Sequence, residues 1–160
     1  MPRVLVSDEL AREGVEILKQ VAEVDEKSGL SEDEICDIIG EYDGLVIRSG
    51  TTVTAKILES ADKLKIIGRA GVGVDNVDVP VATEKGVVVV NSPGGNTIAA
   101  AELTVAMLLS LSRKIPQAYC SMMAREWSRS KFVGNEVYNK TLGVLGLGKI
   151  GQEVAKRLQA

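Results

Sequence analysis

Six residues near the end of the printed chain have the types and spacing of a phosphate-binding turn. Residues 146–151 read GLGKIG, a complete G-x-G-x-x-G. In this pattern the first glycine permits a tight turn, the second lets backbone approach a pyrophosphate, and the third lets a helix pack close to a strand. The β-prone run TLGVL (141–145) precedes the turn, and apolar residues at helical spacing follow from Ile150. We therefore predict a buried strand, a glycine turn and a helix that binds a dinucleotide. A glycine-rich turn that binds nothing is the alternative.

Three further loops have the composition of an anion site. They are Arg48-Ser49-Gly50-Thr51, the segment RAGVGVDN (69–76) and the segment NSPGGN (91–96), each directly after an expected strand. All three are rich in glycine and small polar residues, and two begin with arginine. Backbone N–H groups and guanidinium forks bind carboxylates and phosphates. Because ligands of open α/β sheets bind at the carboxyl ends of the strands, we expect the three loops to form one pocket. Each loop taken singly is more often an ordinary turn between a strand and a helix.

The first ninety residues must supply the scaffold that positions these loops. Short β-prone runs are expected as strands at 4–7, 21–25, 45–48, 65–69 and 87–90, with helical patterns between them. Residues that favour a helix start precede four of those helices, namely Ser7-Asp8, Ser31 with Glu34 in a capping-box pattern, Thr54, and Asp78 before Pro80. Repeated strand–helix units predict a parallel, doubly wound α/β sheet with helices on both faces.

The second part of the chain is expected to be helical up to about residue 125. A turn-rich joint at 91–97 is the predicted domain boundary, and a helix over 98–113 is apolar nearly all round, so it is expected to be buried between layers. Glu102, its one charge before Arg113, is expected at an exposed edge or in a pair. A more polar helix opens at Pro116. The segment 126–140 is a predicted loop with three of the five aromatic residues, which favours either a protein–protein contact or a loop folded onto its own domain.

Composition excludes several classes of function. With 45% hydrophobic and 26% charged residues and a net charge of −3, the chain has a globular composition without the basic surface of a nucleic-acid or anionic-membrane binder. We see no secretory signal and no apolar run long enough to span a bilayer. Cys36 and Cys120 have no metal-ligand spacing and are predicted to be small buried hydrophobes, so no metal site is expected. The chain has no histidine, so a general base must come from another residue type or from elsewhere.

Four motifs in the same order as here resemble the D-2-hydroxyacid dehydrogenase family. They are IRSGTTVT (47–54), GRAGVGVDNVD (68–78), NSPGGNT (91–97) and the turn at 146–151. The likeness extends over the whole chain and is nearest to the branch that oxidises 3-phosphoglycerate in the first step of serine synthesis. It implies a flavodoxin-like parallel-sheet substrate domain over 1–96, followed over 97–160 by the start of a Rossmann NAD-binding domain.

The resemblance also implies roles for individual residues. Those that would bind the substrate are Arg48, Ser49, Arg69, Gly71, Val72, Gly73 and Asn96. Those that would contact the cofactor NAD are Val72, Gly146, Gly148, Lys149, Ile150 and Gly151. Many relatives have arginine at the position of Lys149 and some have threonine at that of Val72, so one possible hydroxyl contact is missing here. The arginine, glutamate and histidine that act in catalysis lie beyond position 160 in relatives, so no catalytic residue is assigned and the isolated chain is expected to be inactive.

The partners implied are a small-molecule substrate and a second copy of the chain, contacted through the region 98–140, with neither nucleic acid nor membrane. A cytoplasmic location is expected, with an organelle left open. The acidic residue that separates NAD from NADP is expected about twenty residues after the glycine turn, so that choice also stays open. The alternatives are a non-catalytic, corepressor-like dinucleotide-binding protein of the same fold, and a dimerising module that uses the segment 127–138.

Overall fold

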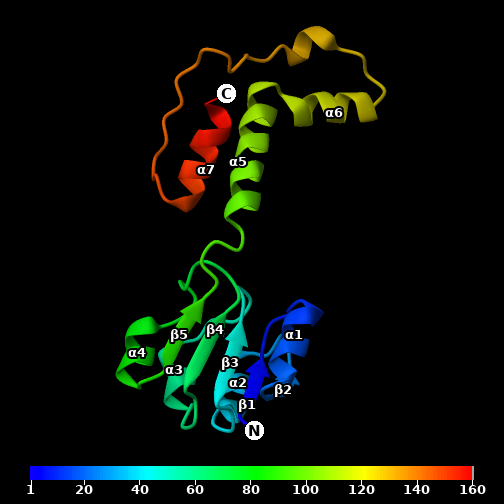
Figure 1. Ribbon diagram of the computed structural model, residues 1–160. Coiled ribbons are helices and arrows are strands. Elements are labelled where there is room, and N and C mark those ends of the chain that lie inside the picture. The colour runs from blue at the N-terminus through cyan, green and yellow to red at the C-terminus, as the bar shows by residue number, and fades with distance from the viewer. Residues whose placement is uncertain (160) are drawn as a thin grey trace. The chain divides into compact units, whose positions relative to one another are not determined.

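The computed structural model describes residues 1–159, which form two compact units, Met1–Gly95 and the part of the chain from Asn96 onward. The first unit is a five-stranded sheet with flanking helices (Figure 1). Its elements in chain order are β1 (Arg3–Val6), α1 (Arg12–Lys19), β2 (Glu23–Glu26), α2 (Glu32–Ile39), β3 (Gly44–Ile47), α3 (Ala55–Glu59), β4 (Ile66–Arg69), α4 (Val79–Glu84) and β5 (Val88–Asn91).

All neighbouring strands of this sheet are parallel, in the order β2-β1-β3-β4-β5. This is the flavodoxin-like order of doubly wound folds, and it confirms the predicted fold class for the first unit. Each strand lies within two residues of its predicted range. The register places Ile47 beside Arg69 and Arg69 beside Asn91, so the carboxyl ends of β3, β4 and β5 are level.

The core lies between one face of the sheet and the helices α2, α3 and α4. Leu5, Leu45, Ile47 and Ile67 point into it from the three strands β1, β3 and β4, and large apolar side chains opposite them come from the helices: Ile35, Ile39, Ile57 and Leu58. Successive residues of a strand face opposite sides. The other face therefore carries Val4 and Val6, which are buried, as is Val15 of α1, and which lie outside that core cluster. Farther along the sheet the same face carries Ile66, Val88 and Val90, which are exposed.

Three of the four predicted helix caps are confirmed. Ser31 and Glu34 form a capping box, and the side chains of Thr54 and Asp78 accept hydrogen bonds from the first turns of α3 and α4. The fourth prediction was wrong. The helix α1 begins after Ala11 without a side-chain cap, and the carboxylate of Asp8 instead accepts hydrogen bonds from the loop at 48–51. The loop offers Asp8 several donors at once, whereas a helix N-terminus would offer one or two.

The second unit consists of α5 (Thr97–Ser112), α6 (Ile115–Met123), the 3₁₀ turn η1 (Arg129–Phe132) and α7 (Lys149–Leu158). The helices α5 and α7 pack side by side (Figure 1), with Ala101 and Val154 buried. Arg157 lies 3.5 Å from a carboxylate oxygen of Glu102 and 2.7 Å from one of Glu153. Glu102 is therefore both exposed and paired, whereas its position predicted one or the other.

The buried strand predicted over 141–145 does not form. No strand lies in the described part of the second unit, and the residues 141–149 are all exposed, Leu145 completely. A strand satisfies its backbone N–H and C=O groups through neighbouring strands. Because the described residues offer none here, an apolar β-prone run remains an extended loop.

The predicted burial of the apolar helix over 98–113 was also wrong. In α5 the side chains of Leu103, Met107 and Leu111 are more than 60% exposed. Burial on all sides requires packed layers on all sides, and α7 covers only one stripe of α5. The cysteines differ in the same way, since Cys36 packs half-buried against the core while Cys120, predicted to be buried, is exposed.

Candidate functional site

The carboxyl edge of the sheet gathers most of the predicted substrate residues. Arg69 ends β4, while the segments that hold Arg48, Ser49 and the loop 71–73 begin where β3 and β4 end. The loops are also joined to one another: the N–H of Ser92 donates to the carbonyl of Gly71 at 2.8 Å, and the Asn91 side-chain amide donates to the carbonyl of Val72 at 2.6 Å. Asn96 is the N-cap residue of α5 and belongs to the second unit.

The guanidinium groups of two arginines at this edge have no carboxylate partner within residues 1–159. Arg48 is exposed, and in the described part of the chain its guanidinium group donates only to the carbonyl of Glu9, at 3.3 Å. Arg69 is half-buried, and its Nε is buried without a hydrogen-bond partner among residues 1–159. By contrast, Arg3 and Arg157 each pair with two carboxylates. The guanidinium groups at the sheet edge are therefore available for an anion, which arginine binds through paired N–H donors.

Gly71 is required for the position of the Arg69 side chain. A Cβ atom at residue 71 would lie far inside 3.0 Å of Arg69 Nη1, because the guanidinium group crosses directly over the glycine. Neither Gly71 nor Gly73 has a positive φ, so a side chain at position 71 would displace the Arg69 guanidinium group rather than strain the backbone. The side chain of Arg69 and the glycine loop thus form one surface.

The loop at 48–51 is held by two side chains that the sequence analysis did not assign to the site. Oδ2 of Asp8 accepts from the N–H of Arg48 at 2.6 Å and from that of Thr51 at 3.1 Å. Nδ2 of Asn76 donates to the carbonyl of Arg48 at 2.7 Å and to that of Thr51 at 2.6 Å. Burial raises the pKa of Asp8, but the hydrogen bonds from the loop outweigh it and hold the pKa below its usual value. The position of Asp8 after β1 is compatible with this role, but because α1 follows, the same position is equally typical of a helix cap.

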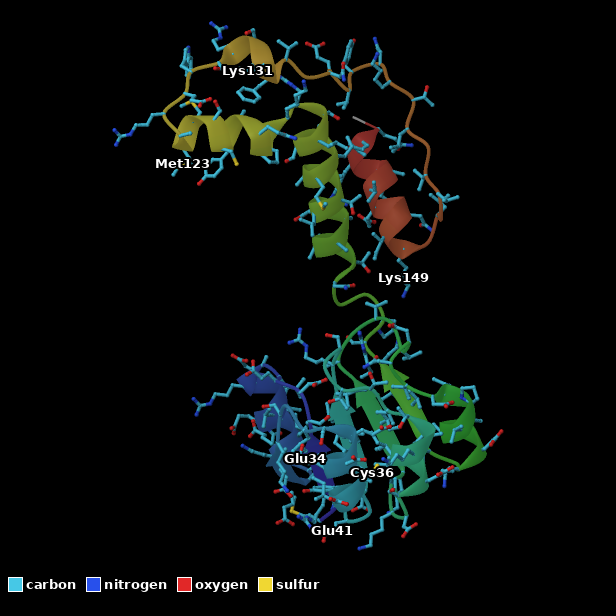
Figure 2. All side chains as sticks on the ribbon, turned by 180° about the vertical axis from the view of Figure 1, so that it is seen from behind. Glu34, Cys36, Glu41, Met123, Lys131 and Lys149 are labelled. Carbon is cyan, nitrogen blue, oxygen red and sulfur yellow. The ribbon has the colours of Figure 1, made fainter. Side chains whose placement is uncertain are left out.

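The glycine turn of the second unit keeps the features of a phosphate-binding turn although the preceding strand is absent. Gly146 has a φ of +93°, which favours glycine, and a Cβ at Gly151 would lie well inside 3.0 Å of the Gly146 carbonyl oxygen. A Cβ at Gly148 would meet nothing within 4 Å. The start of α7 has no side-chain cap, and Lys149 lies there with its side chain exposed (Figure 2).

This geometry fits the diphosphate of a dinucleotide. The first N–H groups of a helix have no partner inside the helix and carry a partial positive charge. At α7 they are accompanied by a cationic side chain, Lys149, and the absent Cβ of Gly148 leaves room beside them. Among residues 1–159 no cluster of carboxylate or cysteine side chains could hold a metal ion, and no described helix is long and apolar enough to cross a membrane.

Comparison with known proteins gives one family. The model of the D-isomer specific 2-hydroxyacid dehydrogenase catalytic domain matches residues 4–158. The D-3-phosphoglycerate dehydrogenase of Synechocystis sp. is 61% identical over 97% of this chain, and that of Methanocaldococcus jannaschii is 52% identical over 100% of it. The chain spans only 28% and 30% of the lengths of these two relatives.

Solved structures agree with the fold. The NAD-dependent formate dehydrogenase of Staphylococcus aureus in complex with NAD matches 99% of this chain with a TM-score of 0.86 and 28% identity. The NAD⁺-bound 3-phosphoglycerate dehydrogenase of Entamoeba histolytica matches 99% of it with a TM-score of 0.79 and 28% identity. This chain covers 53% and 50% of those two chains.

Proposed function

The chain belongs to the D-isomer specific 2-hydroxyacid dehydrogenase family, and from this premise we propose that it is the N-terminal part of an NAD-dependent D-3-phosphoglycerate dehydrogenase. The reaction is oxidation of 3-phosphoglycerate to 3-phosphohydroxypyruvate, the first step of L-serine synthesis. The similarity to D-3-phosphoglycerate dehydrogenases over nearly the whole chain supports this substrate.

The observation that carries the proposal is a pair of guanidinium groups at one edge of the sheet that have no carboxylate partner in the described part of the chain. The substrate has a carboxylate and a phosphate, and Arg48 and Arg69 supply two guanidinium forks for these groups. Ser49 and the backbone of 71–73 add hydrogen-bond donors from the adjoining loops, and we assign Asn96 of the second unit to the same substrate. These residues bind and orient the hydroxy acid and do not take part in bond breaking.

The cofactor proposed is NAD, which accepts the hydride from C2 of the substrate. Its diphosphate would bind at the glycine turn, which is open where that group would lie. The residues that would hold it are Gly146, Gly148, Lys149, Ile150 and Gly151. Val72 is the remaining residue that we assign to the cofactor. The proton of the C2 hydroxyl must pass to a base, and this chain contains no histidine. Since the family resemblance also implies catalytic residues beyond position 160, we expect the base in another part of the full-length protein and no turnover by residues 1–160 alone.

The test is NAD reduction by the full-length protein with 3-phosphoglycerate, glycerate and lactate as competing substrates. Arg69→Gln should raise KM for 3-phosphoglycerate by about 10- to 100-fold, since hydrogen bonds to charged groups contribute about 1.5–3 kcal/mol. Arg12→Gln is the matched control, an exposed arginine of the same unit in α1. Turnover of lactate or glycerate in preference to 3-phosphoglycerate would refute the substrate. NAD binding without turnover of any of the three acids would favour the non-catalytic alternative.

We also propose that a second copy contacts the region 98–140. Its exposed apolar side chains support this, since α5, α6 and the following loop carry many large ones, among them Leu103, Met107, Leu111, Tyr119, Met122 and Trp127. Exposed apolar patches of this kind are typical of protein interfaces. Light scattering of the full-length protein at micromolar concentration tests the proposal, and a monomeric mass would contradict it.

A further inference from the structure

Four backbone groups of the loop at 48–51 are bound by only two side chains of opposite chemistry. Asp8, which can only accept, takes the N–H groups of Arg48 and Thr51, while the amide nitrogen of Asn76, which can only donate, binds the carbonyl oxygens of the same two residues. The backbone N–H and the carbonyl oxygen of both residues therefore have hydrogen-bond partners. We call Asp8 and Asn76 the loop clamp.

The surrounding residues are adapted to this clamp. A Cβ at Gly50 would lie 2.6 Å from Oδ1 of Asp8, so glycine is needed for the carboxylate to reach the loop. The hydroxyl of Thr51 donates to the same oxygen at 3.0 Å and lies 2.9 Å from the hydroxyl of Ser7, in a buried position. The backbone carbonyl of Asn76 in turn accepts from the N–H of Val53 at 2.8 Å.

Asn76 makes its hydrogen bonds to the loop with its side-chain nitrogen, and not with its side-chain oxygen. Its oxygen Oδ1 is buried and has no hydrogen-bond partner among residues 1–159, whereas its nitrogen makes two short bonds. Native proteins rarely leave a buried polar atom unpaired, so the cost of the oxygen is tolerated for the two bonds of the nitrogen. A residue that serves only to fill space would not need either atom.

We propose that Asp8 and Asn76 are positioning residues for substrate binding, which fix the backbone of Arg48 on both sides so that its guanidinium group is held ready for the anionic substrate. This rests on the proposed function of Arg48. Neither residue needs to touch the substrate: Asn76 joins the loop at 48–51 to the glycine loop that follows Arg69, and Asp8 joins it to the end of β1. A binding group held in place before the ligand arrives loses less freedom on binding.

The sharpest variant is Asn76→Asp in the full-length protein. It keeps the size of the side chain but places a carboxylate oxygen against two carbonyl oxygens in place of a donor. At pH 8 we expect KM for the hydroxy acid to rise at least about 10-fold, with KM for NAD within about 2-fold of the wild type. Because a protonated carboxyl group can donate one hydrogen bond again, the ratio of variant to wild-type KM should fall as the pH is lowered toward 5.5. Asp8→Asn, which keeps one acceptor oxygen, should show a smaller rise.

A control separates positioning from loss of stability. Tyr42 lies at the opposite edge of the sheet, before β3, where its hydroxyl donates to Asp25 at 2.8 Å. Tyr42→Phe should lower the melting temperature without changing KM for the hydroxy acid. Amide hydrogen exchange at Arg48 and Thr51 in the unliganded protein gives a second readout. Asn76→Asp should accelerate exchange at these two amides by local opening of the loop. Tyr42→Phe should not accelerate it beyond what its effect on global unfolding accounts for.

The two proposals fail in different ways. A wild-type protein that does not oxidise 3-phosphoglycerate refutes the proposed substrate, and the KM ratios are then measured with whichever 2-hydroxy acid it does oxidise. If the wild type is active, any of three results overturns the clamp. The first is an unchanged KM for the hydroxy acid in Asn76→Asp, and the second is an equal rise of KM for NAD in that variant. The third is an equal rise of KM for the hydroxy acid in Tyr42→Phe. Unchanged exchange at Arg48 and Thr51 in Asn76→Asp overturns it independently of any substrate.

Discussion

Alanine substitutions in the glycine turn test whether its second and third glycines, Gly148 and Gly151, are needed for different reasons. At Gly151 a Cβ would lie well inside 3.0 Å of the carbonyl oxygen of Gly146, so the turn and the start of α7 must move apart. At Gly148 a Cβ would meet no atom of residues 1–159 within 4 Å, and the φ of −74° suits any residue. Gly151→Ala therefore disturbs the protein itself, whereas Gly148→Ala disturbs only a ligand that approaches the backbone there.

The expected magnitudes follow from these distances. Relief of the clash in Gly151→Ala requires a displacement on the order of 1 Å, and a misplacement of that size lowers reaction rates about 100-fold in other enzymes. We expect Kd for NAD to rise about 10- to 100-fold, or about 1.4–2.8 kcal/mol, together with a lower melting temperature. Gly148→Ala should weaken NAD binding by a similar factor, yet leave stability unchanged or higher by about 0.4–1 kcal/mol, as alanine does at permissive glycine positions.

The assay is calorimetric titration of the full-length protein with NAD, alongside thermal unfolding of the unliganded protein. Gly143→Ala serves as the matched control, because a Cβ there also meets nothing within 4 Å and the residue precedes the turn. It should change neither NAD affinity nor, beyond a slight gain, stability. Wild-type affinity in Gly148→Ala would refute the inference that a diphosphate lies against this backbone, and wild-type stability in Gly151→Ala would refute the steric argument.

Two further predictions concern the stability of the sheet unit. Tyr42→Phe should lower the free energy of unfolding by about 1–2 kcal/mol in urea titrations, because it removes a hydrogen bond to the carboxylate of Asp25. Burial, and next the hydrogen bond to Asp25, raise the pKa of Tyr42 to about 12 from an ordinary value of 10.0, so the folded state holds this proton more tightly. The wild-type advantage over Tyr42→Phe should be complete below pH 10 and decline toward pH 12; an advantage constant over this range would contradict the assignment. Ser31→Ala should cost about 1 kcal/mol by removing the capping box with Glu34, whereas Ser28→Ala, in the exposed loop just before it, should cost nothing measurable.

Much of the candidate site was predictable from the sequence because parallel strands bring their carboxyl ends to one edge. Once strands were expected before Arg48, Arg69 and Asn91, their loops had to meet, and the register confirms that the strand ends are level. The clamp was not predictable in this way. Asp8 follows a strand and precedes a helix, so its local pattern is that of a helix cap, and only the folded sheet brings the donors of the loop at 48–51 within 3.1 Å of it.

The sequence by itself determined those elements whose partners are local or lie within the first unit, namely the capping box at Ser31, the five parallel strands and the glycine turn at 146–151. Tertiary structure alone decided the environment of the segments that depend on distant partners. The run at 141–145 has the composition of a buried strand and α5 that of a buried helix, yet both are largely exposed. Their apolar composition favours burial, but burial also requires a partner. A strand needs a neighbouring strand for its backbone hydrogen bonds, and a helix needs surfaces against which its apolar sides can pack.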